Sequence, residues 1–292
     1  MALFALYHSA HQAPCNELNL VLHSVAIESE VALHEGKYYL LVEENTAEVA
    51  YQQLKAYVAE NAPEQIITKP LRPLRKGYAA AYLYAVILLL IGVLQNSLAF
   101  NLDWTQIGLA DSYKINAGQW WLNFTALTLH GDIAHLAGNI GFGVLFGLLV
   151  TQHLGSGAAW FSILFAGAAG NGVNAYLYQS LHQSLGASTM VFAALGMLGV
   201  FSLSTRYNYR QRGLRRWLPF LATVALLAFT GTAGENTDVL AHLSGFASGC
   251  VAALIWRAIG TERAISSRWQ WTTGGASIAL IVLSWGLALS YR

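Results

Sequence analysis

The sequence predicts an all-α polytopic membrane protein with a small N-terminal α+β soluble domain, and three observations lead to this fold class. First, 55% of the 292 residues are hydrophobic and only 11% are charged, which is too apolar for an ordinary soluble fold. Second, seven apolar segments each approach the roughly 20 residues that a helix needs to cross a bilayer. Third, most acidic side chains precede residue 70. We expect a cytoplasmic domain at residues 1–70, a basic linker at 71–77 and a seven-helix membrane domain at 78–292.

The N-terminal domain is predicted to contain two helices and a β-hairpin. Apolar residues at helical spacing predict a helix from Glu17, and the segment from Val31 to Val42 has the pattern of a hairpin. Asn45 followed by Glu48 resembles a capping box and predicts the start of the second helix. The first six residues lack a basic start, so we expect the first membrane helix to target the chain.

The basic residues that flank the membrane segments predict how these segments are oriented across the membrane. We expect helices near residues 78–100, 133–152, 156–178, 187–204, 217–233, 239–258 and 271–290. Lysine and arginine gather before the first segment, between the fourth and fifth, and between the sixth and seventh. Because basic residues accumulate on the cytoplasmic side, these clusters predict a cytoplasmic N-terminus and an external C-terminus.

Polar side chains begin the second, fourth and sixth membrane segments, which all start at the outer leaflet in this topology. Ser188 begins the fourth segment, His242 lies in the first turn of the sixth, and His135 and Asn139 share one face of the second. Polar groups within a membrane bundle cost free energy unless they find partners. Because neutral imidazole can take a serine proton, Ser188 and His242 form a candidate nucleophile and base. His135 and Asn139 are candidate donors to an oxyanion.

Each of these residues also has a structural interpretation. Membrane serines often bond a carbonyl one turn back, and histidine or asparagine can join two helices. The tripeptide Gly-Ala-Ser occurs twice, ending at Ser188 and at Ser277. We expect Ser277 at the cytoplasmic start of the seventh helix, as a packing residue. Asp238, four residues before His242, could complete a triad but is expected to cap the sixth helix.

Glycines beside these residues predict close helix packing. His242, Gly245 and Gly249 lie on one stripe of the sixth helix, and Gly196 and Gly199 reduce the bulk of the fourth helix below its first turn. Small residues let neighbouring backbones approach each other. We therefore expect the fourth and sixth helices to lie in close contact.

Taken in order, these residues resemble the rhomboid family of intramembrane serine proteases, over about residues 118–257. The similar motifs are Gln119-Trp120-Trp121, the H-x-x-x-N motif from His135 to Asn139, Gly186-Ala187-Ser188 as G-x-S, and Ala241-His242 with Gly245 and Gly249. The resemblance implies a rhomboid-like bundle of six transmembrane helices plus one C-terminal helix. It also implies a catalytic dyad of Ser188 and His242, assisted at the oxyanion by His135 and Asn139.

The resemblance implies cleavage of transmembrane segments near the outer face through an acyl-enzyme, in a bacterial inner membrane. Transmembrane protein substrates and the lipid bilayer are the expected partners; no cofactor and no nucleic acid are expected. Because helices hide their carbonyls, substrates with weak helix formers near the outer face should be preferred. The fifth helix is, by resemblance, a candidate lateral gate.

Three residues depart from the usual pattern of that family. Leu122 stands where arginine often follows the tryptophan pair, Thr189 where glycine usually follows the nucleophile, and Phe192 where tyrosine often packs on the catalytic imidazole. Leu122 and Thr189 leave open a second hypothesis, a catalytically inactive rhomboid-like protein that binds or remodels membrane clients. A transporter is a third hypothesis, but the sequence has neither an internal repeat nor ionisable groups near the expected midplane.

Overall fold

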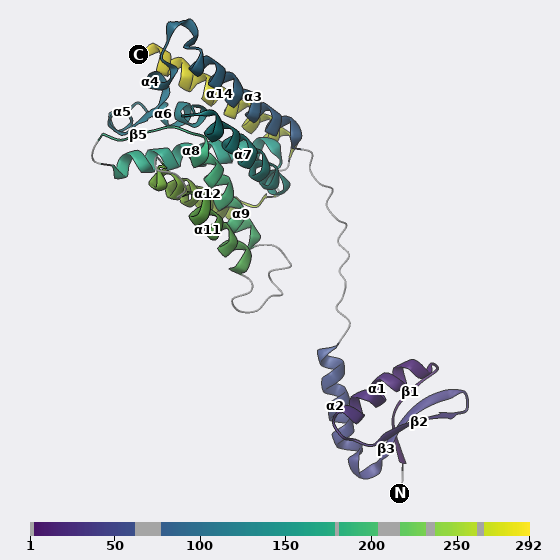
Figure 1. Ribbon diagram of the computed structural model, residues 1–292. Helices are drawn as coiled ribbons and strands as arrows, with labels where there is room; N and C mark the ends of the chain where they lie inside the picture. The colour runs from purple at the N-terminus through teal and green to yellow at the C-terminus, as the bar shows by residue number, and fades with distance from the viewer. Residues whose placement is uncertain (1–2, 62–76, 179–180, 204–216, 232–236, 262–265) are drawn as a thin grey trace. The chain divides into compact units, whose positions relative to one another are not determined.

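The computed structural model describes most of the chain and divides it into two compact units, Met1–Arg72 and Pro73–Arg292 (Figure 1). The described residues are 3–61, 77–178, 181–203, 217–231, 237–261 and 266–292. Apart from Gly77, the predicted basic linker at 71–77 lies outside these residues. The same holds for the arginine cluster predicted between the fourth and fifth membrane helices, at 206–216.

The N-terminal unit is a three-stranded antiparallel sheet packed against two helices. The elements are β1 (Leu3–Ser9), α1 (Gln12–Ser24), β2 (Ser29–His34), β3 (Lys37–Glu43) and α2 (Ala47–Glu60), and the strand order is β1-β3-β2. Leu22 of α1 and Leu54 of α2 pack in one cluster with Leu40 and Val42 of β3. The predicted hairpin is confirmed as β2 and β3.

Three features of this unit differ from the sequence prediction. Strand β1 was not predicted, although it pairs with β3 and makes that strand the centre of the sheet. Helix α1 begins at Gln12, before the predicted Glu17. The capping box was wrong, because Thr46 occupies the N-cap of α2 and makes no side-chain cap bond; a short 3₁₀ turn, Glu44–Thr46, precedes it instead.

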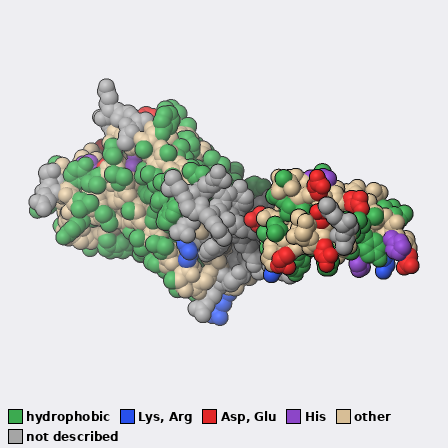
Figure 2. All heavy atoms as spheres, turned by 90° about the horizontal axis from the view of Figure 1, so that it is seen from below, with side chains coloured by type: hydrophobic (Ala, Val, Ile, Leu, Met, Phe, Trp, Pro, Cys, Tyr) green, Lys and Arg blue, Asp and Glu red, His purple; other side chains and the backbone are tan. Residues whose placement is uncertain are grey.

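A helix occupies each of the seven predicted apolar segments. These helices are α3 (Tyr78–Asn96), α7 (Ile133–Leu154), α8 (Ser156–Leu177), α9 (Ser188–Ser202), α11 (Leu218–Gly231), α12 (Val239–Ile259) and α14 (Ser267–Ser290). Among the described helices, α3, α7, α12 and α14 are long and apolar enough to cross a membrane, and α9 and α11 are shorter apolar helices. The chain is therefore an integral membrane protein, and Figure 2 shows the hydrophobic side chains that cover much of the visible surface of this unit.

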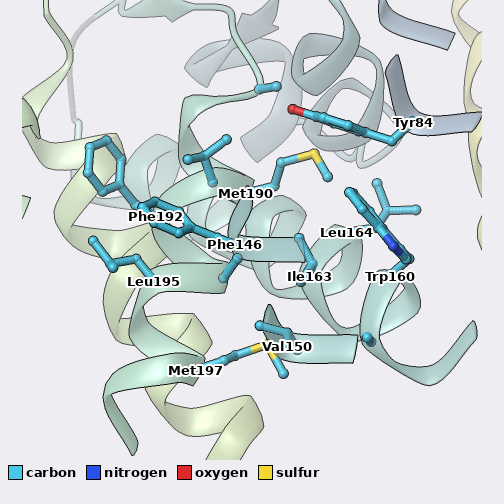
Figure 3. Close-up of a cluster of buried hydrophobic side chains, with 14 of the residues drawn as sticks. Tyr84, Phe146, Val150, Trp160, Ile163, Leu164, Met190, Phe192, Leu195 and Met197 are labelled. Atoms are coloured by element: carbon cyan, nitrogen blue, oxygen red, sulfur yellow. The ribbon is translucent and has the colours of Figure 1, made fainter. Parts of the chain in front are cut away.

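Helix α9 forms the centre of the membrane unit and is almost entirely buried. Figure 3 shows the cluster in which Met190 of α9 packs near Tyr84, Phe146 and Trp160 of α3, α7 and α8. Helix α12 lies directly against α9, as the glycine stripe predicted. A side-chain carbon added at Gly249 would overlap the carbonyl oxygen of Ala193, so only glycine allows this approach.

The connection between α3 and α7 contains short helices and a short strand. They are η2 (Ala99–Asn101), α4 (Trp104–Gly108), β4 (Ala110–Asp111), α5 (Ser112–Asn116), α6 (Leu122–Thr125) and η3 (Ala126–Thr128). Strand β4 pairs with β5 (Gln183–Ser184), which lies between α8 and α9. Leu122 is buried in an apolar cluster with Trp121 and Trp285. A leucine at this position therefore anchors the connection by packing.

Helix α14 is attached to the rest of the unit at both ends. Near its start, Gln270 accepts a bond from the N–H of Gly157 at 2.6 Å and donates to the carbonyl of Leu154 at 2.8 Å. Near its end, the indole of Trp285 donates to the hydroxyl of Thr128 at 3.1 Å. The helix begins at Ser267, so Ser277 lies in its interior and not at its start as predicted.

Candidate active site

Ser188 and His242, from two different helices, meet in a hydrogen bond. Ser188 is the first residue of α9, and His242 lies in the first turn of α12. The distance between Ser188 Oγ and His242 Nε2 is 2.9 Å. The close packing of α9 on α12 thus brings the two side chains together, although 54 positions separate them in the sequence.

The backbone contact of His242 fixes its tautomer. Nδ1 lies 2.8 Å from the carbonyl oxygen of Gly231, the last residue of α11. Because a carbonyl only accepts hydrogen bonds, Nδ1 carries the proton, and Nε2 of the neutral ring is free to accept from the Ser188 hydroxyl. Phe192 packs against the imidazole with the ring centres 4.4 Å apart. The phenylalanine therefore supplies the aromatic contact without a hydroxyl.

The turn before Ser188 depends on Gly186. Its φ of +132° is rarely adopted by residues with a side chain, and its N–H donates to the carbonyl of Ala126 at 2.9 Å. A side-chain carbon here would lie 2.7 Å from Cε1 of His135 and 3.5 Å from Ser188 Oγ. Glycine therefore leaves the space in which the His135 imidazole approaches the serine.

Asn139 lies on α7 one turn after His135, and both residues line the same cavity as Ser188 and His242. The Asn139 side chain is buried, and its Nδ2 has no hydrogen-bond partner among the described residues. The backbone of this turn is fixed by Tyr84, whose hydroxyl donates to the Asn139 carbonyl at 2.8 Å. A buried amide without a partner is a donor available to a ligand.

The cavity has a volume of about 1080 Å³ and combines polar and apolar walls. Phe142 and Phe146 of α7 and Leu226 and Thr230 of α11 line it together with the four predicted site residues. Among the residues that the structure describes, no group of three or more histidine, cysteine, aspartate or glutamate side chains could hold a metal ion. The cavity can thus take an apolar segment next to a serine, an imidazole and the unused amide donor of Asn139.

Thr189 is buried between helices. Its methyl group would lie 2.9 Å from a side-chain carbon at either Gly170 of α8 or Gly245 of α12. The branched side chain thus occupies space that the two glycines leave between α8, α9 and α12. This packing leaves the contact between Ser188 and His242 intact.

Asp238 caps α12, as predicted, by accepting from the N–H of Ala241 at 3.0 Å. Its second carboxylate oxygen accepts from His182 at 2.7 Å and from Asn174 at 2.8 Å, two contacts that the sequence did not predict. Burial alone would raise the pKa of Asp238, but these hydrogen bonds hold it below its ordinary value. No spacing motif links these three residues, and only the fold brings them together.

His130 is a further residue near the site that the motifs did not assign. It is buried, its ring lies 5.3 Å from that of His135, and its Nε2 accepts a long bond of 3.5 Å from the N–H of Ala187. Gln95 of α3 holds its backbone by bonds of 3.1 Å to the N–H and 2.8 Å to the carbonyl. Burial, with the nearby His135, lowers the pKa of His130, so the ring supports the turn before Ser188 in its neutral form.

Comparison with known proteins agrees with this geometry. Residues 117–259 match the Rhomboid domain family. The chain is 31% identical over 147 residues to the protein named rhomboid protease GluP of Bacillus subtilis (strain 168), a region that is 50% of this chain and 28% of that protein. It is 30% identical over 151 residues to rhomboid-like protein 11, chloroplastic, of Arabidopsis thaliana, a region that is 48% of this chain and 53% of that protein.

The chain thus spans about half or less of the length of these curated relatives. The matched region contains α7, α8, α9, α11 and α12, and with them the four predicted site residues. It also contains the last part of the connection between α3 and α7, which includes Leu122. The chain is therefore a rhomboid family protein, whose rhomboid domain extends over residues 117–259.

Proposed function

We propose that this protein is an intramembrane serine endopeptidase that cleaves transmembrane segments of membrane proteins near the outer face of the membrane. The observation that carries the proposal is the 2.9 Å contact between Ser188 Oγ and His242 Nε2, with Nδ1 of the same ring held by the Gly231 carbonyl. A serine next to the unprotonated nitrogen of an oriented imidazole is the arrangement that activates a hydroxyl.

In the proposed reaction, His242 takes the Ser188 proton while Oγ attacks the carbonyl carbon of the scissile peptide. The tetrahedral intermediate collapses, His242 returns the proton to the leaving amine, and the C–N bond breaks to give an acyl-serine. A water molecule then gives a proton to His242 and attacks the ester carbonyl. Proton return to Oγ releases the carboxylic acid product and restores the pair.

The oxyanion of that intermediate needs donors that are already in position. The Asn139 amide supplies one, since Nδ2 is buried and has no partner among the described residues. The His135 imidazole, next to Gly186, supplies a second, and the backbone N–H of Ser188 supplies a third. Two of these donors come from α7 and the third from α9. The segments that precede these two helices pair through β4 and β5, so this pairing helps to fix the oxyanion site.

We propose a topology of six transmembrane helices plus α14, with a cytoplasmic N-terminus and an external C-terminus in a bacterial inner membrane. In this topology the first turns of α7, α9 and α12 face the outer leaflet, where water can reach the acyl-enzyme. Substrate enters between α7 and α11, and this route is supported by the Phe142 and Leu226 side chains on the cavity wall. Helix α11 serves as the gate and also contributes the Gly231 carbonyl to His242.

The hypothesis of an inactive client-binding protein depended on Leu122 and Thr189. Leu122 packs in an apolar cluster, and Thr189 fills the space beside Gly170 and Gly245. Because neither side chain separates Ser188 from His242, the geometry favours the protease over the binding-only hypothesis.

The proposal is tested with purified full-length protein in liposomes and a panel of single-span substrates with glycine or proline near the outer face. Wild type should cleave, and Ser188→Ala and His242→Ala should each be silent. Ser277→Ala serves as the matched serine control and should cleave like wild type. A folded wild-type protein that cleaves no substrate and does not react with a fluorophosphonate would contradict the proposal and favour client binding.

A further inference from the structure

A second polar cluster lies in the wall of the same cavity, where the loop that leads to Ser188 meets the start of α12. Asp238 is its centre: one carboxylate oxygen caps α12, and the other accepts from His182 Nε2 at 2.7 Å and from Asn174 at 2.8 Å. A carboxylate accepts hydrogen bonds, so Nε2 of His182 is the donor. His182 and Asp238 both line the cavity with Ser188 and His242.

His182 is itself held from two further directions. Its ring stacks on Tyr178 at the end of α8, with ring centres 3.7 Å apart and planes 10° from parallel. Its backbone N–H donates to the Ser112 hydroxyl at 3.0 Å, and its carbonyl accepts from the Ser112 N–H at 2.9 Å. His182 is therefore a fixed point of the loop and not a freely rotating side chain.

His182 and Asp238 each lie a few residues before one of the two proposed catalytic residues. His182 precedes Ser188 by six residues, and Asp238 precedes His242 by four, about one helical turn. The contact between His182 and Asp238 therefore joins the segment that carries the serine to the turn that carries the histidine. The hydrogen bond between Ser188 and His242 joins the same two parts of the chain, six and four residues further on.

We propose that His182 is a positioning residue: through Asp238 it fixes the first turn of α12, and with it the distance between the His242 imidazole and Ser188. The inference rests on the proposed proteolysis. Without the His182 bond, Asp238 still caps α12, but the turn loses its direct connection to the Ser188 loop. Small displacements of catalytic groups reduce rates strongly, while substrate binding elsewhere in the cavity is unaffected.

Two substitutions at His182 distinguish the role of its aromatic ring from the role of its N–H donor. His182→Phe keeps a ring over Tyr178 but cannot donate to Asp238, and we expect kcat to fall about 10-fold with KM changed by less than about two-fold. His182→Gln keeps an N–H that can reach the carboxylate, so it should restore most of the rate. A purely structural role of the ring would give the opposite order.

Substitution of Asp238, the acceptor of this hydrogen bond, tests the positioning role independently. Asp238→Ser keeps an N-cap oxygen but is too short to hold His182, so kcat should fall as in His182→Phe. The double variant with both His182→Phe and Asp238→Ser should be no slower than either single variant, because each substitution removes the same hydrogen bond. Asp103→Ser is the matched control, since Asp103 is an exposed aspartate that caps α4 away from the cavity. This control should leave kcat unchanged.

Cleavage by each variant is measured in liposomes with one single-span substrate, and thermal unfolding of each variant excludes loss of fold. If His182→Phe does not fold, Asp238→Ser decides the question. If wild type neither cleaves nor reacts with a fluorophosphonate, the proposed function fails and this inference fails with it. If wild type cleaves, two results would overturn the positioning role and leave the proposed protease activity standing. The first is a wild-type kcat in His182→Phe or Asp238→Ser, whichever of them folds. The second is a kcat of His182→Gln as low as that of His182→Phe.

Discussion

The tripeptide Gly-Ala-Ser occurs at two places in this chain, and its two serines have different surroundings. At Gly186-Ala187-Ser188 the serine begins α9 and lies 2.9 Å from the His242 imidazole. At Gly275-Ala276-Ser277 the serine lies inside α14 and donates to the carbonyl of Thr273, one turn back, at 3.0 Å. The second hydroxyl is therefore used by its own helix.

The glycines of the two tripeptides differ in the same way. Gly186 has a positive φ, and a side-chain carbon there would press on His135. Gly275 is helical, and a side-chain carbon there would have no neighbour within 4 Å. The tripeptide alone thus does not identify a nucleophile. Ser188 is a candidate nucleophile because it begins α9 and lies beside His242 of α12.

The largest expected difference between the two copies is in the serines. Ser188→Ala should lower kcat by about 10⁴-fold or more, because the nucleophile itself is lost. Ser277→Ala should leave kcat within about two-fold of wild type, because a hydroxyl bonded back to its own helix contributes little. Cleavage of one single-span substrate in liposomes measures both; equal losses would contradict the distinction.

The oxyanion donors are expected to give the next largest effect. Asn139→Ala should lower kcat about 10²-fold with little change in KM, because its amide would act mainly in the transition state. Asn96→Ala is the matched control: the Asn96 amide donates to the Gly92 carbonyl of its own helix at 2.8 Å. Steady-state kinetics on both variants test the assignment, and similar kcat values for the two would remove Asn139 from it.

The glycines should differ in stability. Gly186→Ala places a side chain at a positive φ and against His135, and should lower the free energy of unfolding by about 1–3 kcal/mol. Gly275→Ala should raise it by up to about 1 kcal/mol, because alanine favours a helix and the site is open. Denaturant unfolding in mixed micelles measures both signs, and a destabilised Gly275→Ala variant would contradict this interpretation.

The smallest expected effect concerns the residue after the serine. Thr189→Ser removes the methyl group that packs toward Gly170 and Gly245, so the free energy of unfolding should fall by about 1 kcal/mol. Cleavage should remain within a few-fold of wild type, since the Ser188–His242 contact does not involve this methyl group. A loss of cleavage as large as that of Asn139→Ala would show that Thr189 shapes the oxyanion site.

The sequence predicted well those parts of the fold that periodicity and composition encode. The seven apolar helices have the expected order, and the stripe of His242, Gly245 and Gly249 correctly indicated a close contact with another helix, since glycine is a direct cause of such contacts. Strand β1 was missed because its side chains are mostly exposed and show no strict alternation of hydrophobic and polar residues. The capping box failed because a 3₁₀ turn places Thr46, not Asn45, at the start of α2.

At the candidate site, the residue types could be read from the sequence but their connections could not. Ser188, His242, His135 and Asn139 lie along one cavity. The Gly231 carbonyl that orients His242 belongs to the backbone, so no residue type marks it. The contact between His182 and Asp238 joins residues 56 positions apart and depends on how β5 pairs with β4. Such contacts follow from tertiary packing and not from local spacing.

In this mechanism His242 activates Ser188, while Ser277, the second serine of the repeated tripeptide, stays unreactive. The most direct test is to treat wild type, His242→Ala and Ser188→Ala with a fluorophosphonate and to locate the modified residue by peptide mass spectrometry. We expect modification of Ser188 in wild type, none at Ser277, and none in either variant. Modification of Ser277, or undiminished modification of Ser188 in His242→Ala, would contradict this mechanism.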